Sequence, residues 1–199
     1  MVRHIGSIIT PANTRWAYVN VNEPHMMCDG SGRLRYSIRL IIPKVSPVIN
    51  EINDAIYEIW EKSEEINTTP FEDLIKTPLV DGDIKYPNVE EYRDCYYINA
   101  NCDGKSKPDV IDINFERIND PAEIYSGCYG RACIQFYPFR IFKKDNPLYG
   151  KCGIGTALRS LQKTRDGERL GKKSNAFNDF YGIDKSENDF AQTMNFFSF

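Results

Sequence analysis

The sequence predicts a mainly β domain, in which short strands form a small barrel beside one main α-helix. Apolar and polar residues alternate from residue 33 to residue 42, which is the period of a half-buried strand. After Pro43 the apolar residues recur at helical spacing, and four more segments with strand character follow. Of the 199 residues, 41% are hydrophobic and 13% are aromatic, which is enough to fill one packed core.

The first predicted strand places arginines in a row. One face holds Leu34, Tyr36, Ile38 and Leu40, and the other holds Arg33, Arg35, Ser37 and Arg39. Guanidinium groups that project from the same side of a strand can follow a phosphate backbone. The alternative is an ordinary strand face in contact with solvent.

A helix is expected from Pro47 to about Ser63. Ser46 is suited to cap it, and proline is favoured at the first helical position. Its outer face is acidic and holds Glu51, Asp54, Glu58, Glu61 and Glu64. Because carboxylates repel phosphates, we expect this helix to form the back wall of the domain. One or two further helical turns are expected within residues 71–76.

The remaining predicted elements are strands joined by turns. Residues 78–88 contain the turn signals Asp81-Gly82-Asp83 and Tyr86-Pro87, and they are expected to form an exposed insertion without regular structure. Strands are expected at residues 96–101, near 110–115, at 129–142 and at about 156–165. Pro138 marks an edge or a bulge, because proline cannot donate a hydrogen bond to a neighbouring strand.

Charge is strongly segregated, although the formal net charge is only −3. Residues 51–94 carry thirteen acidic and four basic side chains, whereas residues 131–173 carry eleven basic and three acidic ones. Residues 1–47 add six basic side chains against two acidic ones. Two basic blocks therefore flank an acidic block, and the location of the charge says more about partners than its sum does.

Neither a metal site nor a cofactor is expected. The six cysteines form no CxxC pair, and only two histidines occur. The glycine-rich segment 150–156 lacks both the Gly-Lys-Ser/Thr ending of a phosphate-binding loop and the third glycine of a dinucleotide fingerprint, so we interpret it as a tight turn before a strand. No apolar stretch is long enough to span a membrane, and no secretion signal is evident, so a reduced, cytoplasmic protein is expected.

Enzymatic activity is not expected either. No serine lies in a Gly-x-Ser-x-Gly elbow. Pro108-Asp109 followed by Glu116-Arg117-Ile118 is close to the arrangement of a metal-dependent nuclease, but Ile118 occupies the place of the lysine that would orient the attacking water. A nuclease stays open as an alternative.

Aromatic and cationic residues interleave in the basic block from residue 125 to residue 169. In the strand at 129–142, Tyr129, Arg131, Cys133, Gln135 and Tyr137 share one face, and Gly130, Ala132, Ile134 and Phe136 share the other, which is expected to be buried. Cations follow at the strand end and along the last strand, with Arg159, Lys163 and Arg165 in line. Together these strand faces are expected to form a groove. Its aromatic rings can stack on bases, and its cations can neutralise phosphates.

The end of the chain has the composition of a flexible tail. From Ser174 it is rich in Asn, Asp, Ser and Phe and shows no sustained periodicity, so we expect a domain at residues 1–173 and a tail at residues 174–199. The tail ends with Phe196, Phe197 and Phe199. These rings are expected to bind a partner protein or to dock on the domain itself.

Several of these segments resemble phage single-stranded DNA-binding proteins, a family long filed as a domain of unknown function. The resemblance lies in Tyr125-Ser126-Gly127-Cys128, the aromatic strand through Tyr137, and the segment Gly153 to Gly167 that ends in Leu-Gln-Lys-Thr-Arg-Asp-Gly. The strand at Tyr36-Ser37-Ile38, the helix after it, Pro78-Leu79 with Asp81-Gly82-Asp83, and Lys107-Pro108 follow in the order of that family, so the similarity covers roughly residues 5–180.

The resemblance implies an OB-fold, a five-stranded barrel with loop insertions. It also implies binding of single-stranded DNA without strong sequence preference, in phage or prophage DNA replication and recombination. Related replication proteins often end in an acidic tail closed by phenylalanine, which recruits polymerase or other partners. The tail here ends in phenylalanine but is only weakly acidic.

We therefore predict a DNA-binding site and two alternatives to it. The predicted phosphate contacts and the polar residue beside them are Arg33, Arg35, Arg39, Arg131, Gln135, Arg140, Lys143, Lys144, Arg159, Lys163 and Arg165, and the predicted stacking residues are Tyr129, Tyr137, Trp16 and Tyr36. The alternatives are a metal-dependent nuclease and a phage protein-interaction or structural module. A homo-oligomer is compatible with the sequence.

Overall fold

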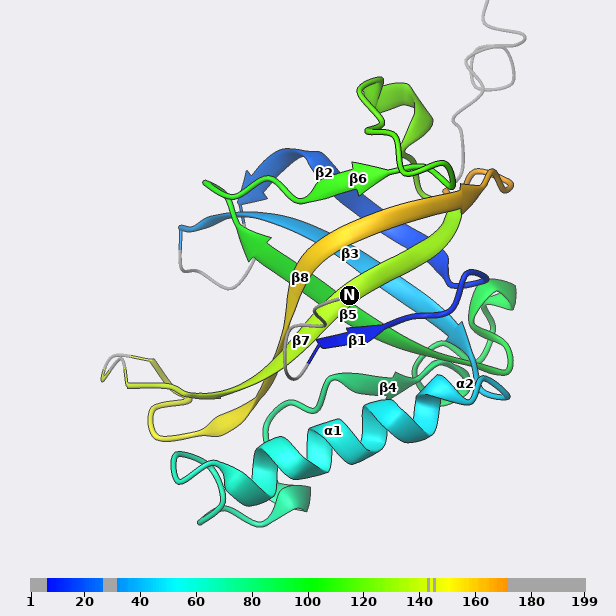
Figure 1. Cartoon of the computed structure of the whole chain (residues 1–199). Coiled ribbons are helices and arrows are strands. Elements are labelled where there is room, and N and C mark those ends of the chain that lie inside the picture. Colours follow the sequence, from blue (N-terminus) through cyan, green and yellow to red (C-terminus); the bar gives the residue numbers. More distant parts are fainter. Residues whose placement is uncertain (1–6, 27–31, 143, 145, 172–199) are drawn as a thin grey trace, which may run out of the picture.

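The computed structural model describes residues 7–26, 32–142, 144 and 146–171 (Figure 1). In these ranges, eight strands and two α-helices follow one another: β1 (Ser7–Ile9), β2 (Arg15–Met26), β3 (Leu34–Pro43), α1 (Val48–Lys62), β4 (Leu79–Asp81), α2 (Gly82–Lys85), β5 (Cys95–Asp103), β6 (Asp109–Ile111), β7 (Tyr129–Arg140) and β8 (Cys152–Arg165). Short 3-10 turns lie at Phe71–Asp73, Glu90–Tyr92 and Pro121–Glu123. The mainly β prediction with one main helix is confirmed.

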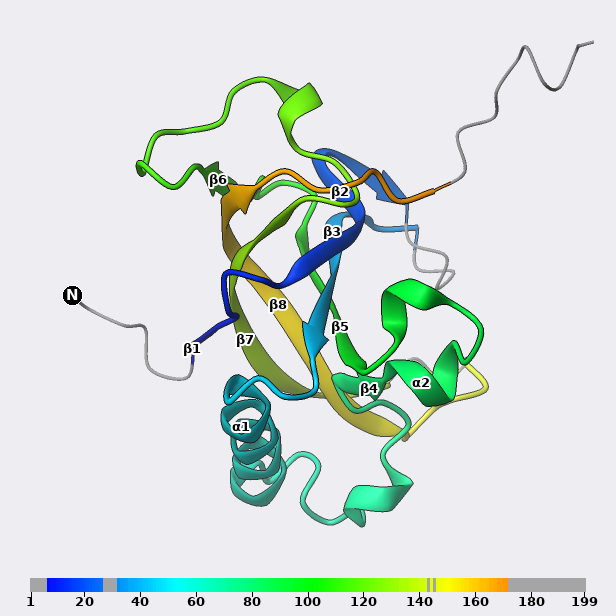
Figure 2. The ribbon, with the colours of Figure 1, turned by 90° about the vertical axis from the view of Figure 1, so that its right-hand side faces the viewer.

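Five of the strands close into a ring. β2 pairs with β3 and β3 pairs with β5, both antiparallel, and β5 then pairs with β8 in parallel. β8 pairs antiparallel with β7, and β7 returns to β2 through Tyr129 and Arg15. Figure 2 shows these strands surrounding a common interior, with α1 below them. This connectivity confirms the predicted OB-fold-like architecture.

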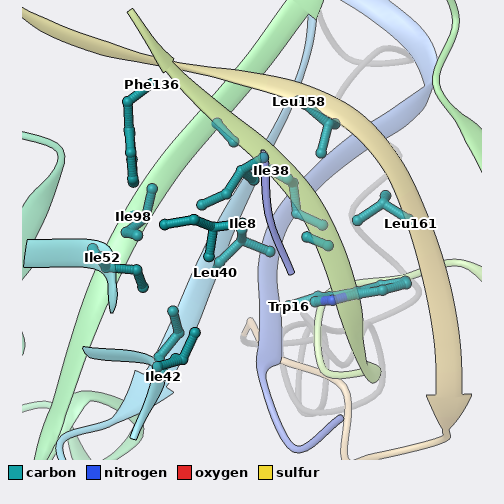
Figure 3. Close-up of a cluster of buried hydrophobic side chains, with 14 of the residues drawn as sticks. Ile8, Trp16, Ile38, Leu40, Ile42, Ile52, Ile98, Phe136, Leu158 and Leu161 are labelled. Carbon is teal, nitrogen blue, oxygen red and sulfur yellow. The ribbon is translucent and has the colours of Figure 1, made fainter. Parts of the chain in front are cut away.

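The core fills the inside of the ring, and α1 covers one end of it. Ile52 and Ile56 on the inner face of α1 are buried, while its acidic face points away from the strands, as expected. Figure 3 shows Ile52 near Ile42 of β3 and Ile98 of β5, all of them buried. Helix and strands therefore share one hydrophobic core, which supplies most of the driving force for folding.

Several predicted elements are found close to their expected bounds. The alternating segment is β3, the helix is α1, and β5 contains the strand expected at 96–101. The strand expected at 129–142 is β7, which ends two residues earlier, at Arg140. Pro138 pairs with Ile154 of β8, while the β1 pairing on the other side of β7 ends at Gln135. At Pro138 the strand is thus an edge, which suits a residue without an N–H group.

Residues 78–88 were expected to be an irregular insertion, and this is wrong. They form β4, which pairs with β5, and the short helix α2. The Asp81 carboxylate accepts hydrogen bonds from the N–H groups of Asp83 and Ile84 and so caps α2. Lys44 Nζ lies 2.7 Å from both the Asp81 and the Asp83 carboxylates, and this contact lowers the pKa of each carboxyl group. Residues 78–88 are thus held in place by ion pairs between the two aspartates and Lys44, which is distant in sequence.

Three other expectations need correction. β8 begins at Cys152, so the glycine-rich segment expected to be a turn lies mostly inside a strand. β6 ends at Ile111, because the Asp112 carboxylate accepts hydrogen bonds from the N–H groups of Asn114 and Glu116 and bends the chain. α1 begins without a side-chain cap from Ser46, since no such hydrogen bond forms at its start.

Two strands, β1 and β2, were not predicted. β2 shifts register against β3 between Ala17 and Asn20 and again between Asn20 and His25, which destroys its alternation of apolar and polar residues. Tyr18 lies in the first of these irregularities, and its φ of +47° is a left-handed conformation. A pattern search based on period two cannot find a strand interrupted in this way.

Candidate functional site

The outward faces of β3 and β5 carry paired polar side chains. Arg35 lies opposite Asp103 and Arg39 opposite Asn99 in the antiparallel register. Arg35 Nη1 donates to Asn101 Oδ1 at 2.5 Å, and Arg39 Nε donates to Asn99 Oδ1 at 2.8 Å. The alternation that buries Tyr36, Ile38 and Leu40 in the core thus turns these arginines outward.

A hollow of about 570 Å³ opens at the Arg35 end of this face. It is lined by Arg35 and Asn101, by Lys107 from the loop after β5, and by Tyr137 and Arg159 from the β7–β8 pair. The parallel pairing of β5 with β8, at Asn101 and Ala157, brings these distant segments together. Cations and an aromatic ring therefore converge on one concave surface.

Tyr137 lies on the backbone of β8 because that strand has no side chain beneath the ring. Tyr137 pairs with Gly155, and a Cβ atom at Gly155 would lie 2.5 Å from the Tyr137 Cζ atom. The next ring, Phe139, covers Gly153 in the same way, with its Cζ atom 3.0 Å from the position of a Cβ. The glycines thus form a floor for two aromatic rings, and Tyr137 remains 37% exposed.

Lys76 adds a further positive charge near this hollow. Its carbonyl accepts the Ile154 N–H at 2.9 Å, which fixes the backbone beside β8. Although the Lys76 side chain reaches solvent, desolvation by the surrounding protein and the positive charge of Arg35 lower the pKa of Lys76. Two neighbouring cations repel each other, and an anion that binds between them offsets this repulsion and stabilises the charged form of both. One carboxylate, Asp103, lines the same hollow.

Arg39, at the other end of the face, is held in a cluster of tyrosines. Its guanidinium carbon lies 4.4 Å from the centre of the Tyr97 ring and 4.6 Å from the centre of the Tyr18 ring. Arg39 Nη1 also donates to the hydroxyl groups of Tyr92, at 2.8 Å, and Tyr86, at 3.2 Å. The structure confirms that Arg39 faces outward, and it adds that the side chain is fixed in place.

Two predicted stacking residues are buried, and the prediction is wrong for both. Trp16 is 0% exposed and Tyr36 is 8% exposed. Figure 3 shows Trp16 among the core side chains inside the ring of strands. Trp16 belongs to the unpredicted strand β2, and Tyr36 follows the alternation that also buries Ile38. Neither ring can stack on a base.

Three other predicted residues are engaged in the fold. Arg140 donates to the backbone carbonyls of Glu65 and Gly150, so its guanidinium joins two loops. Lys163 has a side chain only 11% exposed and pairs with Asp166 at 2.8 Å. Gln135 lines a hollow against the acidic helix α1 together with Glu58 and Lys62. These contacts make the three residues poor candidates for phosphate binding.

The cations of β8 do not lie on one face, contrary to the expectation. β8 shifts register against β7 at Arg159 and again at Thr164, and each extra residue reverses the alternation. Arg159 therefore lies in the hollow beside Tyr137, Lys163 turns inward, and Arg165 lies at the far end of the strand. Two bulges thus account for the failure of a simple period-two prediction.

A second group of predicted residues lies at that far end. The Arg165 guanidinium carbon is 3.5 Å from the centre of the Tyr129 ring, and Arg131 Nη1 donates to Gln162 Oε1 at 2.8 Å. Lys144 is exposed in the loop between β7 and β8, at the opposite end of this strand pair from Arg165, and Arg33 is exposed just before β3. The structure thus distributes the predicted residues over more than one surface.

Several predictions fall outside the part of the chain that the structure describes. Lys143 and the tail residues Phe196, Phe197 and Phe199 are among them, as is the tail boundary at residue 174. Among the described residues, no three His, Cys, Asp or Glu side chains are grouped so that they could hold a metal ion. In the same ranges, no helix is both long and apolar enough to cross a membrane.

Sequence reasoning missed five residues of the β3–β5 face and its hollow: Tyr18, Lys76, Asn99, Asn101 and Lys107. The two asparagines alternate with the buried residues Ile98 and Ala100, so a search of β5 for outward polar residues would have found them. Tyr18 gives no such signal, because β2 is irregular where it lies.

This chain matches a known protein family and is similar to a known phage protein. A family model described as "Enterobacter phage Enc34, ssDNA-binding protein" matches residues 7–191. A protein of Acyrthosiphon pisum secondary endosymbiont phage 1, called putative protein p50, is 32% identical over 164 residues, which cover 78% of this chain and 82% of that protein.

Solved structures that resemble this chain are also of phage single-stranded DNA-binding proteins. The single-stranded DNA-binding protein of bacteriophage Enc34, solved in complex with single-stranded DNA, superposes with a TM-score of 0.67 at 25% identity, over 83% of this chain and 90% of that one. The single-stranded DNA-binding protein gp2.5 of bacteriophage T7 shares the fold, with a TM-score of 0.59 at 16% identity over 90% and 96% of the two chains.

Proposed function

We propose that this chain, which belongs to the family of the Enterobacter phage Enc34 single-stranded DNA-binding protein, binds single-stranded DNA along its β3–β5 face. The observation that carries the proposal is the hollow in which Tyr137 lies flat beside Arg35, Lys107 and Arg159. An aromatic ring accepts any base by stacking, and the cations bind phosphates. Binding is therefore independent of sequence.

The strand follows the outward face of β3 and β5, which is the face that OB-folds use for oligonucleotides. It enters at Tyr137 and runs past Arg35 and Asn101 toward Asn99 and Arg39. Asparagine side chains donate to phosphate or base oxygens through their NH₂ groups while they hold the arginines through their oxygens. The groups lining the path bind and orient DNA, and the family's role is binding rather than catalysis.

The setting of this activity is phage or prophage DNA replication and recombination, in which single strands need protection and organisation. Such work places the protein in the cytoplasm of the bacterial host. The domain at residues 1–173 binds the DNA, and the tail that ends in Phe196, Phe197 and Phe199 recruits replication or recombination proteins.

Fluorescence anisotropy of a labelled oligothymidine strand and of a labelled duplex tests this function. We expect preferential binding of the single strand. If the side chains of Arg35, Lys76, Lys107 and Arg159 each meet a phosphate, log affinity falls with log salt with a slope of about −3. Salt-independent binding, or no binding at low salt, contradicts the proposal. Loss of the labelled strand only when magnesium is added would favour the nuclease alternative.

Substitution of Gly155 by alanine tests the aromatic platform. The added methyl group must displace the Tyr137 ring, because its position lies 2.5 Å from the Tyr137 Cζ atom. A stacked base contributes about 1–3 kcal/mol, so complete loss of the platform lowers affinity by a factor of about 5–150. Anisotropy titrations with oligothymidine measure the change, and circular dichroism checks that the variant is folded.

The matched background for this test is Tyr137→Ala. The three atoms nearest to a methyl group at position 155 all belong to the Tyr137 side chain, so Gly155→Ala should change affinity little further once that ring is absent. If Gly155→Ala weakens binding equally in both backgrounds, the glycine does not act through Tyr137.

A further inference from the structure

Tyr18 is an exposed aromatic residue in a conformation that bulky residues rarely adopt. Its φ is +47°, and its side chain is 63% exposed. It lies in the first irregularity of β2, where the next residue, Val19, turns away to donate its N–H to Ser126 Oγ at 3.1 Å. Strained backbone of this kind concentrates at functional sites, since the surrounding structure must maintain it.

The ring of Tyr18 packs against the guanidinium group of Arg39. The Arg39 guanidinium carbon lies 4.4 Å from the ring centre of Tyr97, which is 4% exposed, and 4.6 Å from the ring centre of Tyr18. Asn99 and the hydroxyl groups of Tyr86 and Tyr92 fix the guanidinium in its plane. One face of the Tyr18 ring therefore rests on an immobilised cation, and the ring is oriented before any ligand arrives.

The members of this cluster differ in exposure. Tyr92 and Tyr97 are 5% and 4% exposed and pack against Ala17 and Ile41, so their rings contribute to the fold. Tyr18, in contrast, gives most of its surface to solvent. An exposed ring held flat by a fixed cation has the properties of a stacking platform, because little side-chain entropy remains to be lost when a base binds.

We propose that Tyr18 is a second base-stacking site, placed at the end of the β3–β5 face opposite Tyr137. The proposal rests on the function proposed above. Arg39 and Arg35 mark the two ends of the face and are four residues apart on β3, a separation of about 13 Å. A single strand of sufficient length contacts both platforms, with the side chains of Arg35, Asn99 and Asn101 between them.

The test compares Tyr18→Ala and Tyr18→Phe with the unchanged protein on oligothymidine and on an abasic strand of the same length. Tyr18→Ala should lower affinity for oligothymidine by a factor of about 5–150 and leave the salt slope unchanged, because no charge is removed. Tyr18→Phe keeps the ring and should bind nearly as well as the unchanged protein. On the abasic strand, Tyr18→Ala and the unchanged protein should bind equally.

Two further variants separate stacking from folding. Tyr18→Gly removes the ring and suits a positive φ, so it should fold at least as stably and lose the same affinity as Tyr18→Ala. Tyr57, on the acidic side of the molecule in α1, is 52% exposed, and Tyr57→Ala should leave affinity unchanged.

The outcomes separate this inference from the proposed function. If the unchanged protein binds oligothymidine and Tyr18→Ala binds it equally well, the second platform is refuted while the proposed function stands. Equal losses on oligothymidine and on the abasic strand likewise refute stacking at Tyr18. If the unchanged protein binds no single strand at all, both proposals are wrong.

Discussion

Replacement of both Arg35 and Arg159 by glutamate should lower the affinity for single-stranded DNA by about two to four orders of magnitude. The two guanidinium groups line the same hollow from β3 and β8, beside Tyr137. A hydrogen bond to a charged group contributes about 1.5–3 kcal/mol, and the loss of two such bonds costs about 3–6 kcal/mol. The new carboxylates add repulsion. The slope of log affinity against log salt should become shallower by about 1.4.

The control for this variant changes the same amount of charge elsewhere. Lys62 and Arg117 are both largely exposed and pair with Glu58 and Asp109 on the surface, so replacing both by glutamate should cost little stability. Anisotropy titrations at two or more salt concentrations compare the two double variants. If they lose affinity equally, net charge governs binding and the proposed hollow is not the site.

Replacement of Trp16 by alanine should cost about 3–5 kcal/mol of unfolding free energy, a large part of the stability of a typical domain. The indole is 0% exposed, and a Cβ atom at Gly130 would lie 2.4 Å from Trp16 Cζ2, so the ring packs directly against the β7 backbone. Urea unfolding followed by circular dichroism measures the loss. At temperatures where the variant is still folded, DNA affinity should change little.

Trp16→Phe is the matched comparison. The indole Nε1 atom is buried without a hydrogen-bond partner, so phenylalanine removes an unpaired polar group while it retains an aromatic ring. We expect a markedly smaller loss of stability than for alanine. An alanine variant of full stability that has lost DNA binding would restore Trp16 to the binding site.

Much of the fold could be predicted because its signals are local. The alternation of β3 and the helical spacing of α1 each fall within a single segment, and both elements lie close to the expected residues. The segment at residues 78–88 could not be predicted in this way. Its order depends on Lys44, which pairs with Asp81 and Asp83 from more than thirty residues away. Turn signals alone cannot reveal such a contact.

The candidate site was predictable only where strands are regular. Arg35 and Arg39 lie on the face that the alternation of β3 predicts, and Tyr137 follows the regular end of β7. Bulges in β2 and β8 account for the main errors: one hides Tyr18, and the others separate Arg159 from Lys163 and Arg165. A bulge depends on both strands of a pair, and the pairing is unknown from one sequence.

The glycine floor beneath Tyr137 limits what conventional mutagenesis can find. An alanine scan removes side chains and records what each one contributed, so it normally passes over a glycine. At Gly155 the contribution is an empty volume, and the expected defect comes from adding one carbon atom. A gain of bulk at this position would therefore displace the Tyr137 ring while every side chain of the proposed site stayed chemically intact.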